Sequence, residues 1–474
     1  MKKLSLLLML LFIFLSSFAH PWKPSHYIVI DTDAGIDDMR AISMLLASDD
    51  VKILGIIISG GALSPYDGYK KVKSMLNAYH HEGIPIAMNY NIRGVDKPVP
   101  LSVTWGVEEG LRVPETNGFN KLCKNILKYE SGTFKIVALA SLNSAAELID
   151  GGVLPTERLS EIVWSNNSLK KLSGFNAAVD IRSANKILKS DVRLTVVGNS
   201  SAKNFYNDEF VNSISKVKTR YAQKIYSTIT SNPDLANHEF ALSASDEMTV
   251  IYLHYPELFN ETLVKKNAFF KPNADADIKG CALDILKGGP DRGHQVFKHI
   301  PVDTSFYQPD LQGFINDIVT AHGQEEWEAC LFTNEIHQHL GIYSIIGAKM
   351  GIRAREYFNV GVDQMKIISS AGSEQPLSCL NDGIQVSTGA TVGHGLLEIR
   401  DTETAPSVEF KHNGNSITIK LKDDLSTKIS EELKDLVIVN GLDNNIYWEL
   451  VRQRAILYWK NLDRYEIFEI ITNL

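Results

Sequence analysis

Residues Tyr27 to Arg40 read YIVIDTDAGIDDMR, and this stretch decides how the first part of the chain folds. An apolar run from Tyr27 to Ile30 is followed by Gly35 and then by apolar residues at helical spacing. The pattern predicts a buried strand, a tight turn through the glycine, and a helix that opens at Asp37 and Asp38.

Four carboxylates lie within eight consecutive positions of this turn: Asp31, Asp33, Asp37 and Asp38. One interpretation is that the last two only cap the helix, since acids in a first helical turn gain from the helix dipole. Four acids in a partly buried turn also repel one another, and a bound hard cation removes that repulsion. Ca²⁺ and Mg²⁺ prefer oxygen ligands, so we favour a metal site here.

Apolar, β-branched runs separated by helical patterns continue along the chain. The strands that they predict are Val51–Ser59, Ile84–Met88, Phe134–Leu139, Ile162–Ser165 and Val192–Val197. Strands that alternate with helices indicate an α/β fold, a mostly parallel sheet with helices on both faces. Ligands of such sheets bind outside the carboxyl ends of the strands, where Asp31 and Asp33 are expected.

The segment Asp31 to Asp38, DTDAGIDD, resembles the D-x-D-P-G-x-D-D signature of the inosine–uridine-preferring nucleoside hydrolases. Ala34 stands where that family usually has proline. Members of the family are α/β enzymes that bind Ca²⁺ and hydrolyse the N-glycosidic bond of ribonucleosides. The resemblance extends over about residues 25–321 and implies this fold, this cofactor and this activity.

Three later segments extend the resemblance. Leu139 falls where the family supplies a backbone carbonyl to Ca²⁺. Asn176 matches the asparagine that contacts ribose hydroxyls, with Gly174 in place of the family's glutamate. Asp246 matches an acidic Ca²⁺ ligand at the start of a helix, and Ser245 stands where the family has a histidine that assists departure of the base.

The resemblance implies a role for each matched residue. The implied Ca²⁺ ligands are Asp33, Asp38, Asp246 and the carbonyl of Leu139. Asp37 and Asn176 are then substrate-binding residues, and Asp31 supports the cluster from behind. Asp33 is also the implied catalytic residue, because it takes a proton from a water that Ca²⁺ activates. That water attacks the anomeric carbon of an oxocarbenium-like sugar.

Departure of the base is the difficulty in this scheme. A purine or pyrimidine leaves poorly as an anion, and a proton donor contributes about 10²–10⁴ in rate. Ser245 is a poor acid. Aromatic stacking on the base is an alternative, for which Trp105 and Trp164 are candidates; the other interpretation of both is packing in the core.

The first residues read as a targeting segment. Lys2 and Lys3 precede an apolar run from Leu4 to Leu15, and Ser17-Phe18-Ala19 offers small residues for cleavage. Residues 1–19 are therefore predicted to be a secretory signal peptide, too short for a membrane span. The prediction is a periplasmic or secreted protein without a membrane anchor. Four cysteines leave one or two disulfides open in an oxidising compartment.

At 474 residues the chain exceeds one ordinary domain. The composition shifts near Lys287 to Pro309, and a helix over Phe314 to Val319 closes the first part. We predict a first domain over 20–321 and a second over 322–474. The formal net charge of −8 argues against nucleic acid as a partner, because phosphate binding needs a basic surface.

The second part resembles a family named after one component of formylmethanofuran dehydrogenase, its E subunit, which implies a smaller α+β domain. The matching segments are EIHQHLG at 335–341, a helix over Tyr343–Phe358, CLNDGIQ at 379–385 and TGATVG at 388–393. His337, His339 and Cys379 are then a second metal site, with Zn²⁺ as its ion. The alternative is two polar loop histidines and a small buried thiol.

Two segments near the end carry structural expectations only. Ser416 to Leu421 alternates apolar and polar residues and is predicted to be an edge strand. Ile446 to Leu462 is an amphipathic helix. Its predicted inward side chains are Trp448, Leu450, Ile456 and Trp459.

Three hypotheses follow. The first is a secreted Ca²⁺-dependent N-glycosyl hydrolase that acts on nucleosides or related ribosyl compounds, a homo-oligomer if it follows the family. The second is a catalytically impaired protein that binds nucleosides or ribosyl compounds. The third is a metal-binding protein whose activity lies in the C-terminal domain.

Overall fold

The computed structural model describes residues 24–92, 105–198, 204–237, 242–290, 300–402 and 404–473. These residues form two compact units. The first contains the described parts of Met1–Val72, Ile86–Asn120 and Gly132–Val296, and the second contains Lys73–Pro85, Lys121–Ser131 and the described parts of Phe297–Leu474. The predicted signal peptide over 1–19 lies outside the described residues.

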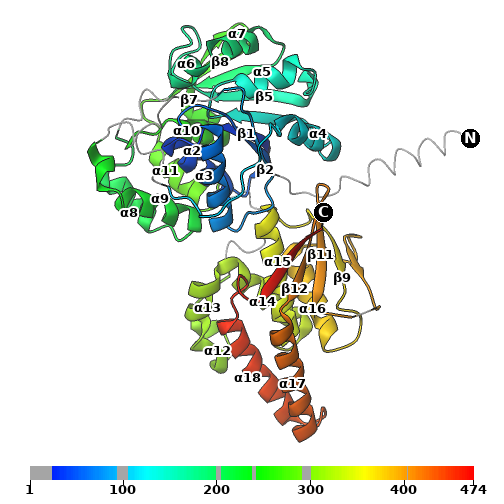
Figure 1. Ribbon diagram of the computed structural model, residues 1–474. Coiled ribbons are helices and arrows are strands. Elements are labelled where there is room, and N and C mark those ends of the chain that lie inside the picture. The colour runs from blue at the N-terminus through cyan, green and yellow to red at the C-terminus, as the bar shows by residue number, and fades with distance from the viewer. Residues whose placement is uncertain are drawn as a thin grey trace, which may run out of the picture. The chain divides into compact units, whose positions relative to one another are not determined.

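The first unit is built on an eight-stranded sheet in the order β3-β2-β1-β4-β5-β6-β8-β7 (Figure 1). All neighbouring strands are parallel except β7 and β8, which form an antiparallel pair. The strands are β1 (His26–Thr32), β2 (Val51–Ile58), β3 (Ile86–Met88), β4 (Phe134–Ala138), β5 (Leu159–Ser165), β6 (Leu194–Val197), β7 (Phe259–Val264) and β8 (Asn267–Pro272).

Helices flank this sheet, and α2 packs against α9, α10 and α11, while α5 packs against α7. In Figure 1, α2 and α10 lie beside β1. The helices of the first unit are α2 (Ile36–Ala47), the part of α3 (Pro65–Ala78) up to Val72, α5 (Asn143–Asp150), α6 (Phe175–Val179), α7 (Ile181–Lys189), α8 (Asp208–Ser215), α9 (Arg220–Thr230), α10 (Asp246–His254) and α11 (Ile278–Leu286). The rest of α3 and most of α4 (Phe119–Tyr129) belong to the second unit.

The predicted α/β fold is confirmed, and its strands lie within a few residues of the predicted ranges. β1 is an apolar run because it is buried on both faces: Ile28 and Ile30 have no exposed surface. β1 pairs with β2 on one side and β4 on the other, so the strand order reverses at this point. Ligands of open α/β sheets bind outside the carboxyl ends of the strands at such a reversal. The β7–β8 pair was not predicted.

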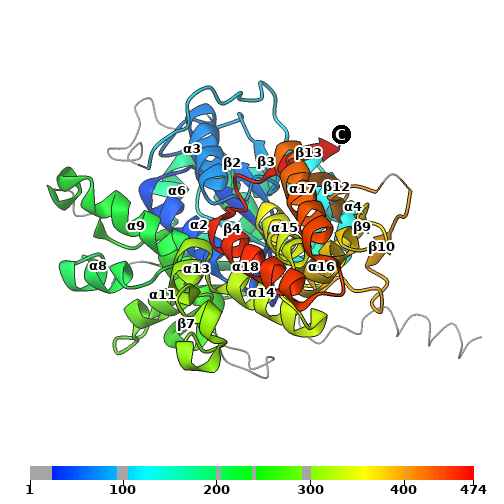
Figure 2. The ribbon, with the colours of Figure 1, turned by 90° about the horizontal axis from the view of Figure 1, so that it is seen from below.

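The second unit contains a five-stranded sheet in the order β10-β9-β11-β12-β13. Its strands are β9 (Lys366–Ser369), β10 (Leu397–Ile399), β11 (Ser407–His412), β12 (Asn415–Leu421) and β13 (Phe468–Asn473). Its helices include α15, which packs against α14, α16 and α18, and the pair α17 and α18 (Figure 2). They are α12 (Pro309–Gln312), α13 (Ile315–His322), α14 (Gln324–His337), α15 (Ile342–Phe358), α16 (Leu380–Thr388), α17 (Asp423–Asn440) and α18 (Asn445–Asn461).

Two expectations for this unit are wrong. The segment Ser416–Leu421 is not an edge strand, because β12 lies between β11 and β13 and pairs with both. Trp448 is not packed inside: 46% of it is exposed, and its indole N–H donates to the Leu442 carbonyl at 3.0 Å. Ile456 and Trp459 are buried as predicted.

No disulfide joins any of the four cysteines, so neither of the bridges that the sequence left open is present. In the described part of the chain, none of the helices has both the length and the apolar character that crossing a membrane requires.

Close backbone contact joins α15 and α16. A Cβ at Gly347 would lie 2.1 Å from the Leu380 carbonyl oxygen, and a Cβ at Gly383 would lie 2.2 Å from the Ser344 carbonyl oxygen and 2.3 Å from the Ala348 nitrogen. The atoms in the way are backbone atoms of the partner helix. The two helices therefore approach one another only because these positions carry no side chain.

We expect Gly383→Ala to lower the melting temperature of the second unit by about 4–8 °C. Overpacking costs about 1–3 kcal/mol or more, which outweighs the gain of about 1 kcal/mol in helix propensity. Differential scanning calorimetry measures the effect. Gly393→Ala is the matched control, because the nearest atom to its Cβ is the flexible Thr391 hydroxyl at 3.7 Å. Equal stability of both variants would contradict the close helix contact.

Candidate functional site

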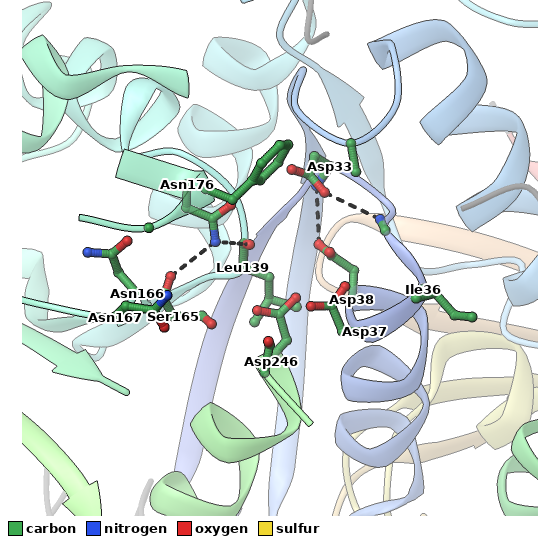
Figure 3. Close-up of a pocket in the computed structure, with 15 residues that line it drawn as sticks. Asp33, Ile36, Asp37, Asp38, Leu139, Ser165, Asn166, Asn167, Asn176 and Asp246 are labelled. Atoms are coloured by element: carbon green, nitrogen blue, oxygen red, sulfur yellow. Dashed lines mark hydrogen bonds between the residues drawn. The ribbon is translucent and has the colours of Figure 1, made fainter. Parts of the chain in front are cut away.

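A pocket of about 300 Å³ lies at the carboxyl ends of β1, β4 and β5 (Figure 3). Its walls come from the β1–α2 turn, the ends of two further strands, helix α6 and the start of α10. The lining residues are Asp33, Gly35, Ile36, Asp37, Asp38, Ala62, Leu139, Ser165, Asn166, Asn167, Gly174, Phe175, Asn176, Ser245 and Asp246.

Three carboxylates meet in this pocket. Asp37, Asp38 and Asp246 each offer one oxygen, and these oxygens lie within 4.8 Å of one another. Figure 3 shows the three side chains directed toward a common point, with Leu139 beside them. Asp246 comes from a helix more than two hundred positions along the chain, so tertiary structure alone joins it to the first two. Within the described ranges, this is the one group of three or more potential metal-ligating side chains at such spacing.

The β1–α2 turn fixes Asp38. The Thr32 hydroxyl donates to Asp38 Oδ1 at 2.5 Å, and the Asp33 amide donates to the same oxygen at 3.2 Å. Ala34 has a φ of +59°, a left-handed conformation that proline cannot adopt. Alanine at this position, where the related signature has proline, is therefore compatible with the turn as this chain forms it.

Asp33 is 2% exposed and is held from two sides. Its Oδ1 accepts the Gly35 amide at 3.3 Å. Its Oδ2 is buried without a hydrogen-bond partner among the described residues. A Cβ at Gly61, in the loop after β2, would lie 1.9 Å from that Oδ2, so only glycine leaves room for the carboxylate. A buried, unpartnered carboxylate oxygen indicates a ligand that the protein itself does not supply.

Asp31 lies behind the pocket rather than in its lining. Its side chain accepts the Ser59 hydroxyl at 2.6 Å, and its backbone carbonyl accepts the Leu139 amide at 2.8 Å. Asp31 therefore ties the ends of β1, β2 and β4 together. Burial raises its pKa to about 7. The supporting role that the resemblance implies for Asp31 stays a prediction.

A buried ion pair fixes α2 relative to α10. Arg40 Nε lies 2.6 Å from Glu247 Oε1, and the Tyr206 hydroxyl donates to the same carboxylate at 2.9 Å. Glu247 also accepts the Ser245 amide at 3.0 Å. Because Asp37 and Asp38 precede Arg40 on one helix and Asp246 precedes Glu247 on the other, this pair sets the distance between the pocket carboxylates.

Burial makes these carboxylates resist ionisation. The pKa of Asp38 and that of Asp246 are raised well above the ordinary value, by burial first and by neighbouring carboxylates second. Burial raises the pKa of Asp33 to about 6, and the charge of Asp37 adds to the rise. The carboxylates cannot all carry charge without a counter-charge. The ligand atoms that these carboxylates offer are all oxygens, and Asp33 Oδ2 has no hydrogen-bond partner among the described residues. Such a site fits a hard divalent cation such as Ca²⁺.

Leu139 and Asn176 are joined in the pocket. The Asn176 amide nitrogen donates to the Leu139 carbonyl at 2.7 Å and to the Ser165 carbonyl at 3.0 Å. These two bonds occupy both amide hydrogens and leave the Asn176 side-chain oxygen as an acceptor. The Leu139 carbonyl keeps a second lone pair. The predicted ligand and substrate roles of these two residues, and those of the aspartates, stay predictions.

Among the lining residues that were not predicted from the sequence, Asn166 and Phe175 bear on what the pocket can bind. Asn166 is 6% exposed, and its side-chain oxygen is buried without a partner among the described residues. Phe175 is 46% exposed and lines the pocket next to Asn176. The sequence offered an aromatic directly before the matched asparagine, which was the available signal for Phe175.

Of the two interpretations of Trp105 and Trp164, packing in the core is confirmed and stacking on a base is not supported. Trp164 has no exposed surface, and its indole N–H donates to the Ala140 carbonyl at 2.9 Å. Trp105 is 3% exposed. Neither belongs to the pocket lining, because both are core residues.

Gly174 and Ser245, the two departures from the related family, both line the pocket. Gly174 has a φ of +129°, and a Cβ there would lie 2.4 Å from Asn166 Oδ1. A glutamate at this position is incompatible with the present backbone. Ser245 directly precedes α10.

The second predicted metal site is partly assembled. His337 Nε2 lies 3.1 Å from Cys379 Sγ, and the rings of His337 and His339 are 3.9 Å apart between centroids. Asp382, which was not predicted as a ligand, has a carboxylate oxygen 3.8 Å from His337 Nε2. Burial raises the pKa of the Cys379 thiol to about 11. A Zn²⁺ site at these residues stays a prediction.

Comparison with known protein families identifies the family of this chain. A model of the family described as inosine-uridine preferring nucleoside hydrolase matches residues 28–325, more than half of the chain. The chain therefore belongs to the inosine–uridine-preferring nucleoside hydrolase family. A second model, described as FmdE, molybdenum formylmethanofuran dehydrogenase operon, matches residues 336–454. Family membership supports N-glycosidic hydrolase activity.

Similar proteins include solved hydrolases. The purine-preferring ribonucleoside hydrolase from Gardnerella vaginalis is 13% identical, with a TM-score of 0.45, over 55% of this chain and 99% of that one. The inosine-uridine preferring nucleoside hydrolase from Bacillus anthracis is 13% identical, with a TM-score of 0.43, over the same shares. An uncharacterized protein of Schizosaccharomyces pombe is 22% identical over 185 residues, 36% of this chain and 60% of the relative's length.

We expect Asp246→Asn to abolish stabilisation by Ca²⁺ without destabilising the metal-free protein. The substitution removes a ligand and also removes one repelling charge. In the parent protein, Ca²⁺ at a hundred times its dissociation constant adds about 2.7 kcal/mol, a rise of about 5–10 °C in melting temperature. Differential scanning fluorimetry with Ca²⁺ and with chelator measures the difference. The exposed Asp234→Asn is the matched control, and a full Ca²⁺ response in Asp246→Asn would count against this site.

We expect the stability of the metal-free protein to fall as pH rises from about 4 to about 7. The pKa values of Asp33 and Asp31 are raised from 3.8 to about 6 and about 7 in the folded protein. The folded state therefore holds protons that the unfolded chain has lost over this range, and linkage makes stability decrease with pH. Ca²⁺ replaces those protons. The difference in melting temperature between Ca²⁺ and chelator should thus grow from pH 5 to pH 7.5; a constant or shrinking difference would refute this assignment.

Proposed function

We propose that this protein is a Ca²⁺-dependent hydrolase of the N-glycosidic bond in nucleosides or related ribosyl compounds. The observation that carries the proposal is the pocket itself. Carboxylates from two helices and a strand end line one pocket at the switch point of the sheet, and Asp33 has a buried oxygen without a partner among the described residues. Family membership gives this pocket its reaction class.

Each pocket residue has a part in the proposed reaction. Asp33, Asp38, Asp246 and the Leu139 carbonyl would hold Ca²⁺, whose positive charge acidifies a water and neutralises the carboxylates. Asp33 would accept the proton of the attacking water, because it lines the pocket and its Oδ2 has no hydrogen-bond partner among the described residues. Asp37 and the Asn176 side-chain oxygen would accept ribose hydroxyls.

Asn166 is proposed as a third sugar contact. Among the residues that the structure describes, its buried side-chain oxygen has no partner, and a buried acceptor left without a donor costs about 1–3 kcal/mol. A ribose hydroxyl would supply the donor. With the glutamate of the family replaced by Gly174, this acceptor is a polar group that the pocket retains at that side.

A secreted or periplasmic location is part of the proposal. It is supported by the basic pair Lys2-Lys3, the apolar run Leu4–Leu15 and the small residues that follow. A substrate pocket formed by oxygen ligands suits a compartment where Ca²⁺ is abundant.

We expect the purified protein with Ca²⁺ to release free base from at least one nucleoside or ribosyl compound, and Asp33→Asn to lose this activity by more than about 10²-fold. The substitution removes both the proposed proton acceptor and a proposed Ca²⁺ ligand, and both are needed to activate the attacking water. Reversed-phase chromatography of a riboside panel measures the release, with chelator as a second control. Asp31→Asn is the matched variant outside the pocket lining and should be less severe. Absence of base from every riboside would rule out the proposal.

One observation favours the second hypothesis, a ribosyl-binding protein without turnover. The position of the family's histidine holds Ser245, which lines the pocket and is a poor proton donor. In that case the protein would bind ribosides with Ca²⁺, and calorimetry would detect binding in the absence of any free base.

A further inference from the structure

Large apolar side chains are exposed on the hairpin that α17 and α18 form in the second unit. The two helices lie side by side in both ribbon views (Figure 1, Figure 2). Ile438 and Val439, in the last turn of α17, are 80% and 79% exposed. The other exposed apolar residues of the hairpin are Leu442 in the connecting turn and Ile446, Trp448 and Leu457 in α18. Apolar side chains that gather in this way on a surface mark an interaction site.

Helix α18 has apolar residues on two opposite faces. The inner face packs into the core of the second unit with Tyr447, Val451, Ala455, Tyr458 and Trp459. The outer face carries a stripe of four residues at intervals of four, three and four positions: Ile446, Leu450, Gln453 and Leu457. With 3.6 residues per turn, these four lie within about 60° of one another around the helix axis. Leu450 is half-buried and the other three are exposed, so the stripe runs along the solvent-exposed side of α18.

The spacing of this stripe indicates what covers it. Residues that alternate at intervals of three and four form the seam through which two helices pack side by side. The partner is therefore a helix with a matching stripe, and α18 of a second copy, running in the opposite direction, supplies one. When Ile446 lies opposite Leu457 of the second copy, Leu450 lies opposite Gln453, so every position of the stripe meets another. A shift by one heptad leaves Ile446 or Leu457 without a stripe residue opposite it.

Charge favours the antiparallel orientation. Asp443 and Glu449 lie just before and within the first part of α18, and the exposed Arg454 lies in its second half. Two further basic residues, Arg452 and Lys460, already form ion pairs within the unit. Antiparallel pairing brings the acidic end of each helix to the basic end of the other, whereas parallel pairing brings like charges together. Complementary charge sets the orientation and register of an interface.

We propose that this protein self-associates through its second unit, with α18 of one copy packed antiparallel against α18 of a second copy along this stripe. Ile438, Val439 and Leu442 extend the apolar surface beside the start of each α18. The interface lies outside the nucleoside hydrolase part of the chain, so it does not depend on the function proposed for the carboxylate pocket.

Sedimentation velocity of the full-length purified protein measures the association. We expect the parent to be a dimer, or a larger assembly with an even number of copies, at micromolar concentration. Leu457→Glu should halve that mass, with a dissociation constant raised at least about 10²-fold, because an unpaired carboxylate enters an apolar contact. Leu263→Glu, at an exposed leucine of β7 in the first unit, is the matched control and should keep the parent's mass. A monomeric parent, an unchanged mass in Leu457→Glu, or equal dissociation of both variants would overturn the proposal.

Disulfide cross-linking tests the register with milder substitutions. We expect Ile446→Cys and Leu457→Cys, co-expressed with different tags, to form a mixed disulfide under mild oxidation. Neither variant should link to itself, because equivalent residues then lie about 16 Å apart along the antiparallel helices, too far for a disulfide. The parent protein controls for links through its native cysteines. Self-linking without the mixed product would replace the antiparallel pair by a parallel one, and an associated parent without a mixed disulfide would rule out this interface.

Discussion

Repulsion between buried carboxylates is the constraint on which the rest of this site depends. The fold brings oxygens of Asp37, Asp38 and Asp246 within 4.8 Å of one another, and the side chains of Asp38 and Asp246 are buried. Charges in a medium of low dielectric interact far more strongly than in water. The carboxylates are close together and little screened, so the repulsion between them is strong. The surrounding structure works against this repulsion: the Arg40–Glu247 pair holds the two helices, and Thr32 holds Asp38. The repulsion is removed when some of the carboxylates are protonated or when a cation binds between them.

The local part of the site could be predicted from the sequence, because strand, turn and helix lie within fourteen consecutive residues and each leaves its own pattern. Asp246 has no such pattern; it was found only through the family resemblance, since the contact with Asp38 is created by tertiary packing. Asn166 was missed for the same reason. Asn166 matters because its side-chain oxygen is buried and has no hydrogen-bond partner among the described residues. The residues next to it in the sequence predict neither property.

The wrong predictions have a common physical origin. Trp448 was predicted to be buried from the helical pattern, yet whether a large aromatic lies in a core, in a pocket or at the surface is decided by elements distant in sequence. The same holds for β12, which was taken for an edge strand. Its second partner, β13, forms from the last residues of the chain, and the short polar alternation there gave no signal.

Gly174 has a consequence for how this chain can evolve. The residue combines a φ of +129° with a carboxamide oxygen 2.4 Å from where a Cβ would be. Return of the family's glutamate by one substitution would strain the backbone and collide with Asn166 at once. At least the loop and its neighbour would have to change together, so a lineage with this glycine is separated from its relatives by an epistatic barrier. A carboxylate can then return to this position only together with a rearranged loop.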